Sequence, residues 1–196
     1  MTTKLTPAVF LDRDGVLIED VHLLTRPDQM VLLPEVPQAL RALRGAGFKL
    51  IMVSNQTVVA RGLASEAEVG AVNAHLNALL RRADAPALDG VYVCPHHPSA
   101  TLLQYRVACD CRKPRPGLFI QAASEHDVNL QVSYAVGDRI TDIIAGVRAG
   151  CRTVLVLTGK HADAPIESPD GIDANTLPDH TCSSLAAAAE WILKQK

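Results

Sequence analysis

Five short apolar runs alternate with longer amphipathic segments, and this alternation constrains the fold more than any other feature of the chain. The runs cover residues 8–11, 48–53, 91–93, 134–136 and 153–157. Short runs that are apolar throughout are typical of strands buried on both faces of a parallel sheet. Helical spacing is found at residues 34–47, 65–83, 118–126, 139–149 and 184–194. The alternation predicts an α/β fold, a Rossmann-like doubly wound parallel sheet flanked by helices.

Size and composition restrict the class of protein further. The chain has 196 residues, 48% hydrophobic and 20% charged, which suits one soluble domain over residues 1–196. A net charge of −2 gives no electrostatic footprint for nucleic acid or an anionic membrane. The sequence has no stretch of about 18–20 apolar residues and no signal-peptide pattern. We therefore expect a cytoplasmic monomer. Residues 158–182, rich in Pro, Asp and Gly, predict a surface loop with a short edge strand.

Polar side chains follow three of the predicted strands. Asp12 and Asp14 come after the first strand, Ser54 and Asn55 after the second, and Asp138 after the fourth. Aspartate is also an ordinary turn residue, and Ser54 or Asn55 would equally suit a helix cap. The carboxyl ends of parallel strands, however, share one edge of the sheet, where ligands of open α/β folds bind. Clustered carboxylates call for a cation, and oxygen ligands with room for water suit Mg²⁺.

Lys113 is the natural cationic side chain for this edge. A lysine chosen at random is usually a solvated surface residue. Lys113, however, lies between Arg112 and Pro114 immediately before a predicted helix, where proline fixes the backbone and the helix start favours anions. A magnesium site with a hydroxyl, an amide and a lysine suits phosphoryl transfer, in which catalysis is mostly positioning and charge neutralisation.

A second group of residues has the spacing of a structural metal site. Cys94 and His96 form one pair, Cys109 and Cys111 form another, and residues 94–111 make a loop between them. Three thiolates and one imidazole are a closed tetrahedral set typical of structural zinc. His97 is a rival ligand, and the alternatives to zinc are unpaired loop cysteines or a disulfide. The total of five cysteines is odd, which argues against a complete disulfide framework.

The order of these motifs resembles that of the haloacid dehalogenase-like phosphatases. The matching stretches are Asp12-x-Asp14-Gly15-Val16, Ser54-Asn55, Lys113-Pro114 and Gly137-Asp138-x-x-x-Asp142. They extend over residues 8 to about 157. In these phosphatases, an aspartate two residues after the nucleophile marks the phosphatase activity, and Asp14 occupies that position here.

The resemblance implies a role for each matched residue. Asp12 would be the nucleophile that forms an aspartyl-phosphate, and Asp14 would be the general acid and then the general base. Ser54 and Lys113 would hold the phosphoryl oxygens. Mg²⁺ would be bound by Asp12, the carbonyl of Asp14 and Asp138.

The loop motifs narrow the resemblance to two families. Cys-Pro-His-His-Pro followed by Cys-x-Cys-Arg-Lys-Pro-x-Pro-Gly closely resembles the D-glycero-D-manno-heptose 1,7-bisphosphate phosphatases, and nearly as closely the histidinol-phosphate phosphatases. Both families are capless, and their pattern favours His96 over His97 as the zinc ligand. The heptose enzymes remove the C7 phosphate and leave the 1-phosphate for synthesis of nucleotide-activated heptose, a precursor of the lipopolysaccharide core. We expect this activity, with histidinol phosphate as the alternative substrate.

The same resemblance gives a set of substrate-binding residues. They are Asp20, Asn55, Gln56, Thr57, Arg112 and Arg139. Asp142 is expected to orient neighbouring groups rather than to bind the metal. The chain departs from the family at Val16 and Ser54, where threonine is frequent, and at Arg139, where lysine is common; arginine keeps the charge but changes its geometry.

A different class of function is also open to this sequence. A zinc-stabilised binding module could retain the fold after its phosphatase site has decayed. The intact set of Asp12, Asp14, Lys113 and Asp138 argues against this alternative. His22 matches no motif and is expected to be a surface residue.

Overall fold

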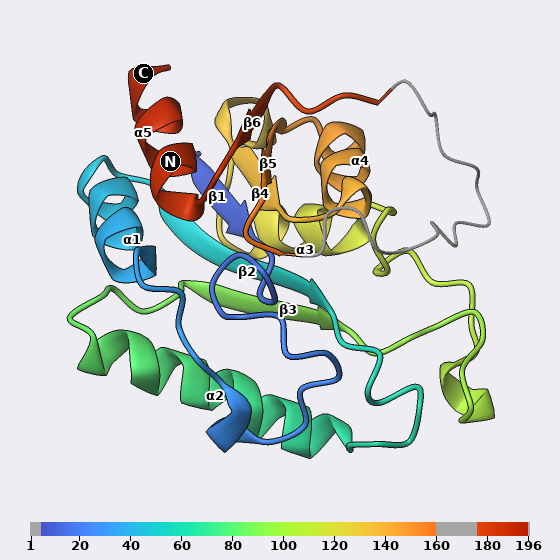
Figure 1. Ribbon diagram of the computed structural model, residues 1–196. Coiled ribbons are helices and arrows are strands. Elements are labelled where there is room, and N and C mark those ends of the chain that lie inside the picture. Colours follow the sequence, from blue (N-terminus) through green and yellow to red (C-terminus); the bar gives the residue numbers. More distant parts are fainter. Residues whose placement is uncertain (1–4, 160–175, 196) are drawn as a thin grey trace.

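A six-stranded, wholly parallel sheet forms the centre of the molecule (Figure 1). The computed structural model describes residues 5–159 and 176–195. In chain order the strands are β1 (Ala8–Leu11), β2 (Lys49–Asn55), β3 (Gly90–Cys94), β4 (Tyr134–Gly137), β5 (Arg152–Val156) and β6 (His180–Cys182). Their order across the sheet is β3-β2-β1-β4-β5-β6. The predicted parallel sheet is confirmed, and β6 is the edge strand expected within residues 158–182.

Helices connect these strands and cover both faces of the sheet. The α-helices are α1 (Val36–Gly45), α2 (Glu66–Arg82), α3 (Gly117–Glu125), α4 (Ile140–Ala149) and α5 (Leu185–Lys194). Short 3₁₀ turns occur at η1 (Pro27–Gln29), η2 (Leu103–Tyr105) and η3 (Leu130–Val132). Three residues are too few to give a readable period, so these turns were not predicted from the sequence.

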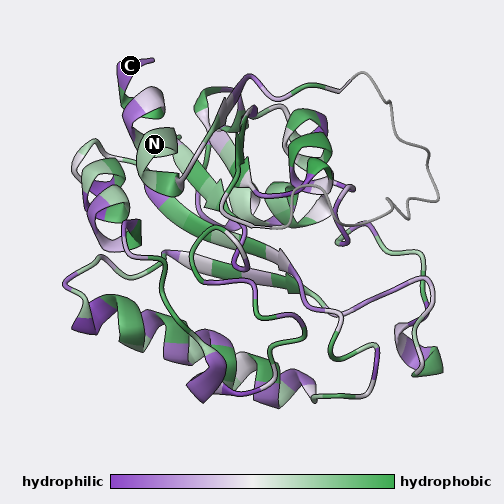
Figure 2. Cartoon of the chain, viewed as in Figure 1, coloured by the Kyte–Doolittle hydropathy of each residue, from purple (hydrophilic) through white to green (hydrophobic). Residues whose placement is uncertain are grey.

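Alternate residues of the strands face two separate hydrophobic cores. In β1, Val9 and Leu11 pack in the core formed with α1, α2 and α5, whereas Ala8 and Phe10 pack in the core formed with α3 and α4. Phe10 and Phe119 of α3 contact each other with ring centroids 4.9 Å apart. Figure 2 shows the hydrophobic sheet between helices whose outer faces are mixed in polarity. Because both faces are covered, every residue of β1 is buried, as its unbroken apolar sequence predicts.

β1 lies where the chain reverses its winding direction across the sheet. Its neighbours are β2 on one side and β4 on the other, and β4 follows about 120 residues later in the sequence. The amide of Asp12, directly after β1, donates to the carbonyl of Val136 in β4 at 3.0 Å. Asp12 is thereby placed at the topological switch point, where open α/β sheets bind their ligands.

The second strand differs from its predicted bounds. The sequence predicts that it ends before Ser54, but β2 continues through Ser54 and Asn55, which pair with Val93 and Cys94 of β3. The neighbouring strand supplies hydrogen bonds that extend β2 beyond its apolar run. Both polar residues are consequently held in the sheet and not in a flexible connection.

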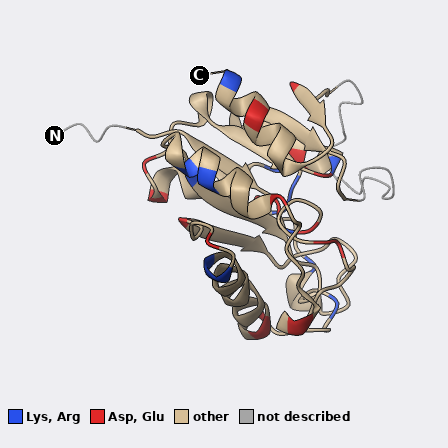
Figure 3. Cartoon of the chain, turned by 60° about the vertical axis from the view of Figure 1, so that its left-hand side comes forward, with Lys and Arg blue, Asp and Glu red and all other residues tan. Residues whose placement is uncertain are grey.

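Two further features complete the fold. No α-helix among residues 5–159 and 176–195 combines the length and the apolar character that a bilayer span requires. Figure 3 shows acidic and basic residues scattered over the helices and loops in this view, in accord with a net charge of only −2. Residues 160–175, within the predicted 158–182 loop, lie outside the described residues.

Candidate active site and metal cluster

A cleft of about 380 Å³ opens at the carboxyl edge of the sheet. Every catalytic and substrate-binding residue predicted from the sequence lines it, namely Asp12, Asp14, Asp20, Ser54, Asn55, Gln56, Thr57, Arg112, Lys113 and Arg139. They come from the ends of β1 and β2, from the segment before α3 and from the start of α4. The predicted convergence of polar strand ends is therefore present in the structure.

Lys113 contacts two carboxylates and a backbone carbonyl in the cleft. Its Nζ lies 2.7 Å from Asp12 Oδ1 and 2.6 Å from Asp142 Oδ1, and it donates to the Val53 carbonyl at 2.7 Å. The lysine is only 4% exposed. Burial lowers its pKa, but the carboxylates of Asp12 and Asp142 outweigh burial, so the pKa lies above its ordinary value. Lys113 is charged and oriented before any substrate arrives.

Asn55 fixes the backbone that carries this lysine. Its Oδ1 accepts from the Lys113 amide and its Nδ2 donates to the Lys113 carbonyl, each at 3.1 Å. On the far side, Arg148 of α4 donates to the carbonyl of Pro114 at 3.2 Å. The amide of Asn55, which was predicted to contact substrate, is thus engaged in holding Lys113 in place.

Three carboxylates gather next to Lys113. Asp12, Asp138 and Asp142 each offer an oxygen within 4.8 Å of the others, which is close enough to share one ion. Hard oxygen ligands of this kind suit Mg²⁺. Asp142 is also held by the Arg139 amide, which donates to its Oδ2 at 3.0 Å. Burial raises the pKa of Asp142, and Lys113 opposes that rise.

Glycines allow the chain to approach Asp138 closely. Gly15 has a φ of +76°, and a Cβ there would lie 2.7 Å from Asp138 Oδ2. A Cβ on Gly159 would lie 2.1 Å from the same oxygen. Larger residues at either position would displace the Asp138 carboxylate. Gly15 therefore serves both the turn and the packing against the Asp138 carboxylate.

Arg13 and Asn73 contact Asp14 directly or through one another, although neither was among the predicted site residues. The Arg13 guanidinium donates to Asp14 through Nε and Nη2, with its shortest contact at 2.9 Å to Oδ2, and through Nη1 to Asn73 Oδ1 at 3.1 Å. Burial raises the pKa of Asp14, Arg13 opposes this and Asp12 adds to it, leaving the pKa above its ordinary value. Arg13 itself is 2% exposed.

Ser54 and Gln56 form a neighbouring pair on the other wall of the cleft. Gln56 Nε2 donates to Ser54 Oγ at 2.8 Å, and both side chains are buried. A hydroxyl that accepts from an amide keeps its own proton available for donation. Ser54 can therefore donate to an anion in the cleft.

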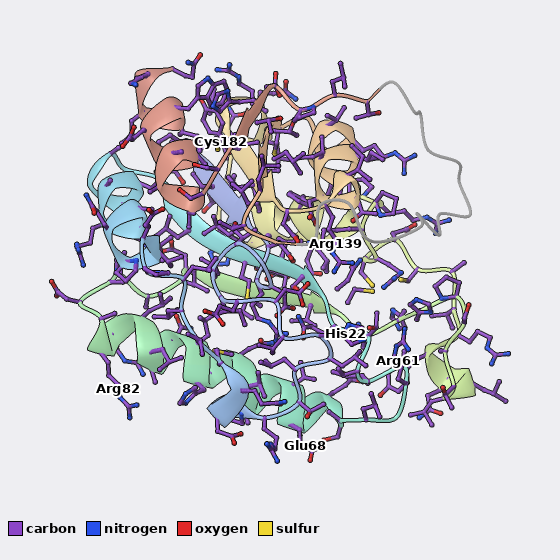
Figure 4. The ribbon with its side chains drawn as sticks, viewed as in Figure 1. His22, Arg61, Glu68, Arg82, Arg139 and Cys182 are labelled. Atoms are coloured by element: carbon purple, nitrogen blue, oxygen red, sulfur yellow. The ribbon has the colours of Figure 1, made fainter. Side chains whose placement is uncertain are left out.

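Arg139 and Asp20 close one end of the cleft. Arg139 Nη2 lies 3.2 Å from Asp20 Oδ2, and its Nε lies 3.9 Å from Asp138 Oδ2. Asp20 Oδ1 also accepts from the His22 amide at 3.0 Å, and His22 has a φ of +50°. His22 is an exposed residue as expected, yet it lines the cleft, as does Arg61 (Figure 4).

The four predicted zinc ligands form one cluster beside this cleft. The Sγ atoms of Cys94, Cys109 and Cys111 and Nδ1 of His96 make contacts of 3.0–3.7 Å with one another. A tetrahedral zinc with bonds of about 2.3 Å to sulfur separates its ligands by about 3.8 Å, so the set is compact enough to enclose that ion. His97, the rival ligand, instead accepts from the Ser99 amide through Nδ1 at 3.1 Å and lines the cleft.

The thiols of the cluster shift one another's pKa values, because they lie within hydrogen-bonding distance. Hydrogen bonding with Cys94 and Cys109 lowers the pKa of Cys111 to about 5, while hydrogen bonding with Cys111 and burial raise the pKa of Cys94. Thiolate character is what a metal ion requires of cysteine. The donor set therefore fits zinc, which would be bound by all four residues.

The metal cluster is linked directly to the catalytic cleft. Arg112, which follows Cys111, donates to the His96 carbonyl at 3.1 Å, and the next residue is Lys113. Arg115 donates to the Cys109 carbonyl at 3.1 Å, and Gly117 at the start of α3 donates to the Asp110 carbonyl. A structural ion at residues 94–111 would fix the backbone that leads into Arg112 and Lys113, both of which line the cleft.

Comparison with known proteins identifies relatives over nearly the whole chain. A family model described as HAD-hydrolase-like matches residues 110–188. The chain is 37% identical over 194 residues to D-glycero-beta-D-manno-heptose-1,7-bisphosphate 7-phosphatase of Escherichia coli O6:H1, covering 98% of this chain and 97% of that protein. It is 39% identical over 189 residues to D-glycero-D-manno-heptose-1,7-bisphosphate 7-phosphatase of Thermosynechococcus vestitus, covering 95% of each.

Comparison with solved structures identifies a relative from the same family. The crystal structure of D,D-heptose 1,7-bisphosphate phosphatase from B. bronchiseptica, complexed with magnesium and phosphate, has a TM-score of 0.79 and 31% identity, and the match covers 98% of this chain and 100% of that one. Fold and sequence thus agree over the full length of the relatives. The chain belongs to the D-glycero-D-manno-heptose-1,7-bisphosphate 7-phosphatase family of HAD-like phosphatases.

Proposed function

We propose that this chain removes the C7 phosphate of D-glycero-D-manno-heptose 1,7-bisphosphate through an aspartyl-phosphate on Asp12. One observation carries the mechanism: Lys113 Nζ contacts both Asp12 and Asp142 in a cleft that also contains Asp14. The curated relatives described above supply the substrate. Asp12 and Asp138 together with the Asp14 carbonyl would hold Mg²⁺, which neutralises phosphate charge when bound.

The first chemical step transfers the phosphoryl group to Asp12. Lys113 engages Asp12 Oδ1, which leaves Oδ2 to attack phosphorus. The bond between Oδ2 and phosphorus forms while the bond from phosphorus to the C7 oxygen breaks. Asp14 gives its proton to that oxygen, and its raised pKa keeps it protonated closer to neutral pH, as a general acid needs.

The second step returns the enzyme to its starting state. Asp14, now ionised, takes a proton from water, and the water oxygen attacks the phosphorus of the aspartyl-phosphate. The bond from phosphorus to Asp12 breaks and inorganic phosphate leaves. Ser54 and Lys113 donate to the phosphoryl oxygens in both steps, because positioned donors stabilise the charge of the transition state.

The remaining cationic side chains of the cleft suit the rest of the substrate. Arg112 and Arg139 line the cleft beyond the carboxylates, with Asp20, Gln56 and Thr57 as further polar groups. Guanidinium groups recognise phosphate through two parallel hydrogen bonds. A sugar with a second phosphate would use these contacts more fully than a substrate with one phosphate.

Initial rates of phosphate release with Mg²⁺ would test the proposal on three substrates: the α and β anomers of heptose 1,7-bisphosphate and histidinol phosphate. We expect a strong preference for one or both bisphosphates, and the ratio of the anomers defines the natural substrate. Efficient turnover of histidinol phosphate with none of either bisphosphate would overturn the assignment. Asp12→Asn should abolish release, and unchanged release would remove Asp12 as the nucleophile.

The proposal also includes the domain organisation, oligomeric state and location of the protein. A single domain over residues 1–196, present as a cytoplasmic monomer, suits a cluster of thiols that must stay reduced in order to bind zinc. Light scattering on the purified protein would test the monomer. Metal analysis of protein purified without chelator should find about one zinc per chain, as four ligands of one closed site require.

A further inference from the structure

Asp14 is held by a second layer of residues that reaches α2. Three contacts join Arg13 to Asp14: Nε to Oδ1 at 3.2 Å, Nη2 to Oδ1 at 3.1 Å and Nη2 to Oδ2 at 2.9 Å. The remaining arm of the guanidinium, Nη1, donates to Asn73 Oδ1 at 3.1 Å. The Arg13 guanidinium is thus held by hydrogen bonds to Asp14 on one side and to Asn73 on the other.

Asn73 is a polar residue on the buried face of its helix. The other buried residues of α2 are Val69, Val72, Leu76 and Leu80, all apolar. A buried amide costs free energy unless it is hydrogen-bonded, and Asn73 is only 5% exposed. Its hydrogen bond with Arg13 offsets that cost. Because the guanidinium is planar and rigid, Nε, Nη1 and Nη2 can keep these contacts together only in this orientation.

We propose that Asn73 is a positioning residue for the acid and base carboxylate, acting through Arg13. This inference rests on the proposed function of Asp14. Asn73 fixes the plane of the Arg13 guanidinium, and that plane fixes the direction of the Asp14 carboxyl. Arg13 makes two hydrogen bonds to Asp14 Oδ1 and one to Oδ2. Oδ2 therefore loses fewer hydrogen bonds when it turns from Arg13 to the substrate.

The leaving group distinguishes this role from a merely structural one. The leaving oxygen of an alkyl phosphate such as the sugar bisphosphate must receive a proton, whereas p-nitrophenyl phosphate releases p-nitrophenolate, which leaves as an anion without one. The ratio of kcat/KM for the alkyl substrate to kcat/KM for the aryl substrate therefore reports how well Asp14 is aimed. General acid catalysis contributes roughly 10²–10⁴-fold to the rate. A misoriented Asp14 carboxyl would lose part of this contribution, so the ratio should fall by about tenfold.

Asn73→Ala is the central variant, and Asn77→Ala is its matched control. Asn77 lies one turn further along α2 and accepts from the Leu88 amide at 3.0 Å, outside the Arg13 network. We expect the ratio to fall about tenfold in Asn73→Ala and to stay unchanged in Asn77→Ala. Equal losses on both substrates, or an equal change in the ratio for both variants, would overturn the proposal.

A second pair of variants keeps the test decisive if Asn73→Ala does not fold. Asn73→Asp retains an acceptor oxygen for Arg13 and should restore the ratio to within about threefold of the wild type, since a charged acceptor binds at least as strongly. Arg13→Lys removes the fork and should lower the ratio as Asn73→Ala does. A lowered ratio in Asn73→Asp, or a normal ratio in Arg13→Lys, would contradict the positioning role.

The test of the positioning role can be read separately from the test of the proposed substrate. If the wild type fails on the heptose bisphosphate but hydrolyses another alkyl phosphate, the ratio is measured on that alkyl phosphate. In that case the substrate assignment fails, and the Asn73 variants still test the positioning role. If the bisphosphate is turned over and the ratio is the same in every variant, the substrate assignment stands and the positioning role fails.

Discussion

Replacing Lys113 with methionine probes how the cleft balances its charges. The substitution keeps most of the side-chain volume but removes two ion pairs, at 2.6 and 2.7 Å, and the hydrogen bond to the Val53 carbonyl. Removing one partner of a buried pair costs about 3–5 kcal/mol, because the other charge is left without compensation. We expect a loss of this size in the free energy of unfolding at pH 7. Phosphate release should fall about 10²–10³-fold.

The loss should depend on pH in a direction that follows from Asp142. Burial already holds the pKa of Asp142 above its usual 3.8, and Lys113 acts against that rise. Without the lysine, the folded-state pKa of Asp142 rises further. A carboxyl whose folded pKa exceeds its unfolded value supports stability at low pH and loses that support as pH rises through the folded pKa. The penalty should therefore shrink on acidification from pH 7, by up to about 1.4 kcal/mol per pH unit.

Urea unfolding of wild type and Lys113→Met from pH 7 down to pH 5, without added Mg²⁺, would measure this difference. Lys194→Met at the exposed end of α5 is the matched control and should change stability by less than about 0.5 kcal/mol. A penalty below about 1 kcal/mol at pH 7 would refute the reasoning. So would a penalty that grows as the pH falls.

Three further perturbations test other parts of the structure. Cys109→Ser should lower zinc content and reduce phosphate release about 10–100-fold, measured by metal analysis and initial rates. Burial raises the Asp89 pKa, but hydrogen bonds from the Arg44 side chain and the Leu50 amide outweigh burial, so the pKa is lowered. Because the carboxyl is partly exposed, we expect Asp89→Asn to lower the free energy of unfolding at pH 7 by only about 1 kcal/mol. That cost should begin to shrink as the pH falls below 3.8 and should vanish once the pH is below the lowered folded-state pKa of Asp89. Gly137→Ala would place a Cβ 2.1 Å from Asp142 Cβ and should cost about 1–3 kcal/mol of unfolding free energy and lower kcat.

Each of these perturbations has a control within the chain. Cys151→Ser changes a buried cysteine outside the metal cluster and should leave zinc content intact. Asp84→Asn alters a fully exposed carboxyl 4.0 Å from its arginine and should change the free energy of unfolding at pH 7 by less than about 0.5 kcal/mol. Gly45→Ala adds a Cβ with nothing within 4 Å and should be tolerated. A substitution at the site that behaves like its control would contradict the geometry on which it was chosen.

The sequence contains enough local information to predict the layers of the fold and the edge that bears the site. Unbroken apolar runs such as residues 8–11 identify buried parallel strands, and polar residues directly after them identify the binding edge. Ser65 and Glu68 predict the start of α2, where both reciprocal hydrogen bonds of the capping box are present. These features depend on neighbours close in the sequence.

Contacts between distant residues could not be predicted in this way. Asn55 and Lys113 are 58 residues apart, and their pair of hydrogen bonds gives Asn55 a role in supporting the lysine that its place in the sequence does not indicate. Arg13 and Asn73 are 60 residues apart, and nothing in the spacing of α2 distinguishes Asn73 from a misplaced polar residue. Such pairs depend on how strands and helices come together, which no local pattern encodes.

The position of β1 in the middle of the sheet has a consequence for synthesis on the ribosome. Chains fold progressively as they emerge, with N-terminal parts first. The half-sheet β1-β2-β3 is complete once Cys94 has emerged, whereas the other neighbour of β1 is β4, which begins at Tyr134. Until then, one edge of the strand that leads to Asp12 has no partner, and Asp138 does not yet exist. Asp12, the proposed nucleophile, is among the first residues made, but Asp138 and Asp142 beside it are translated only when about seven-tenths of the chain is complete.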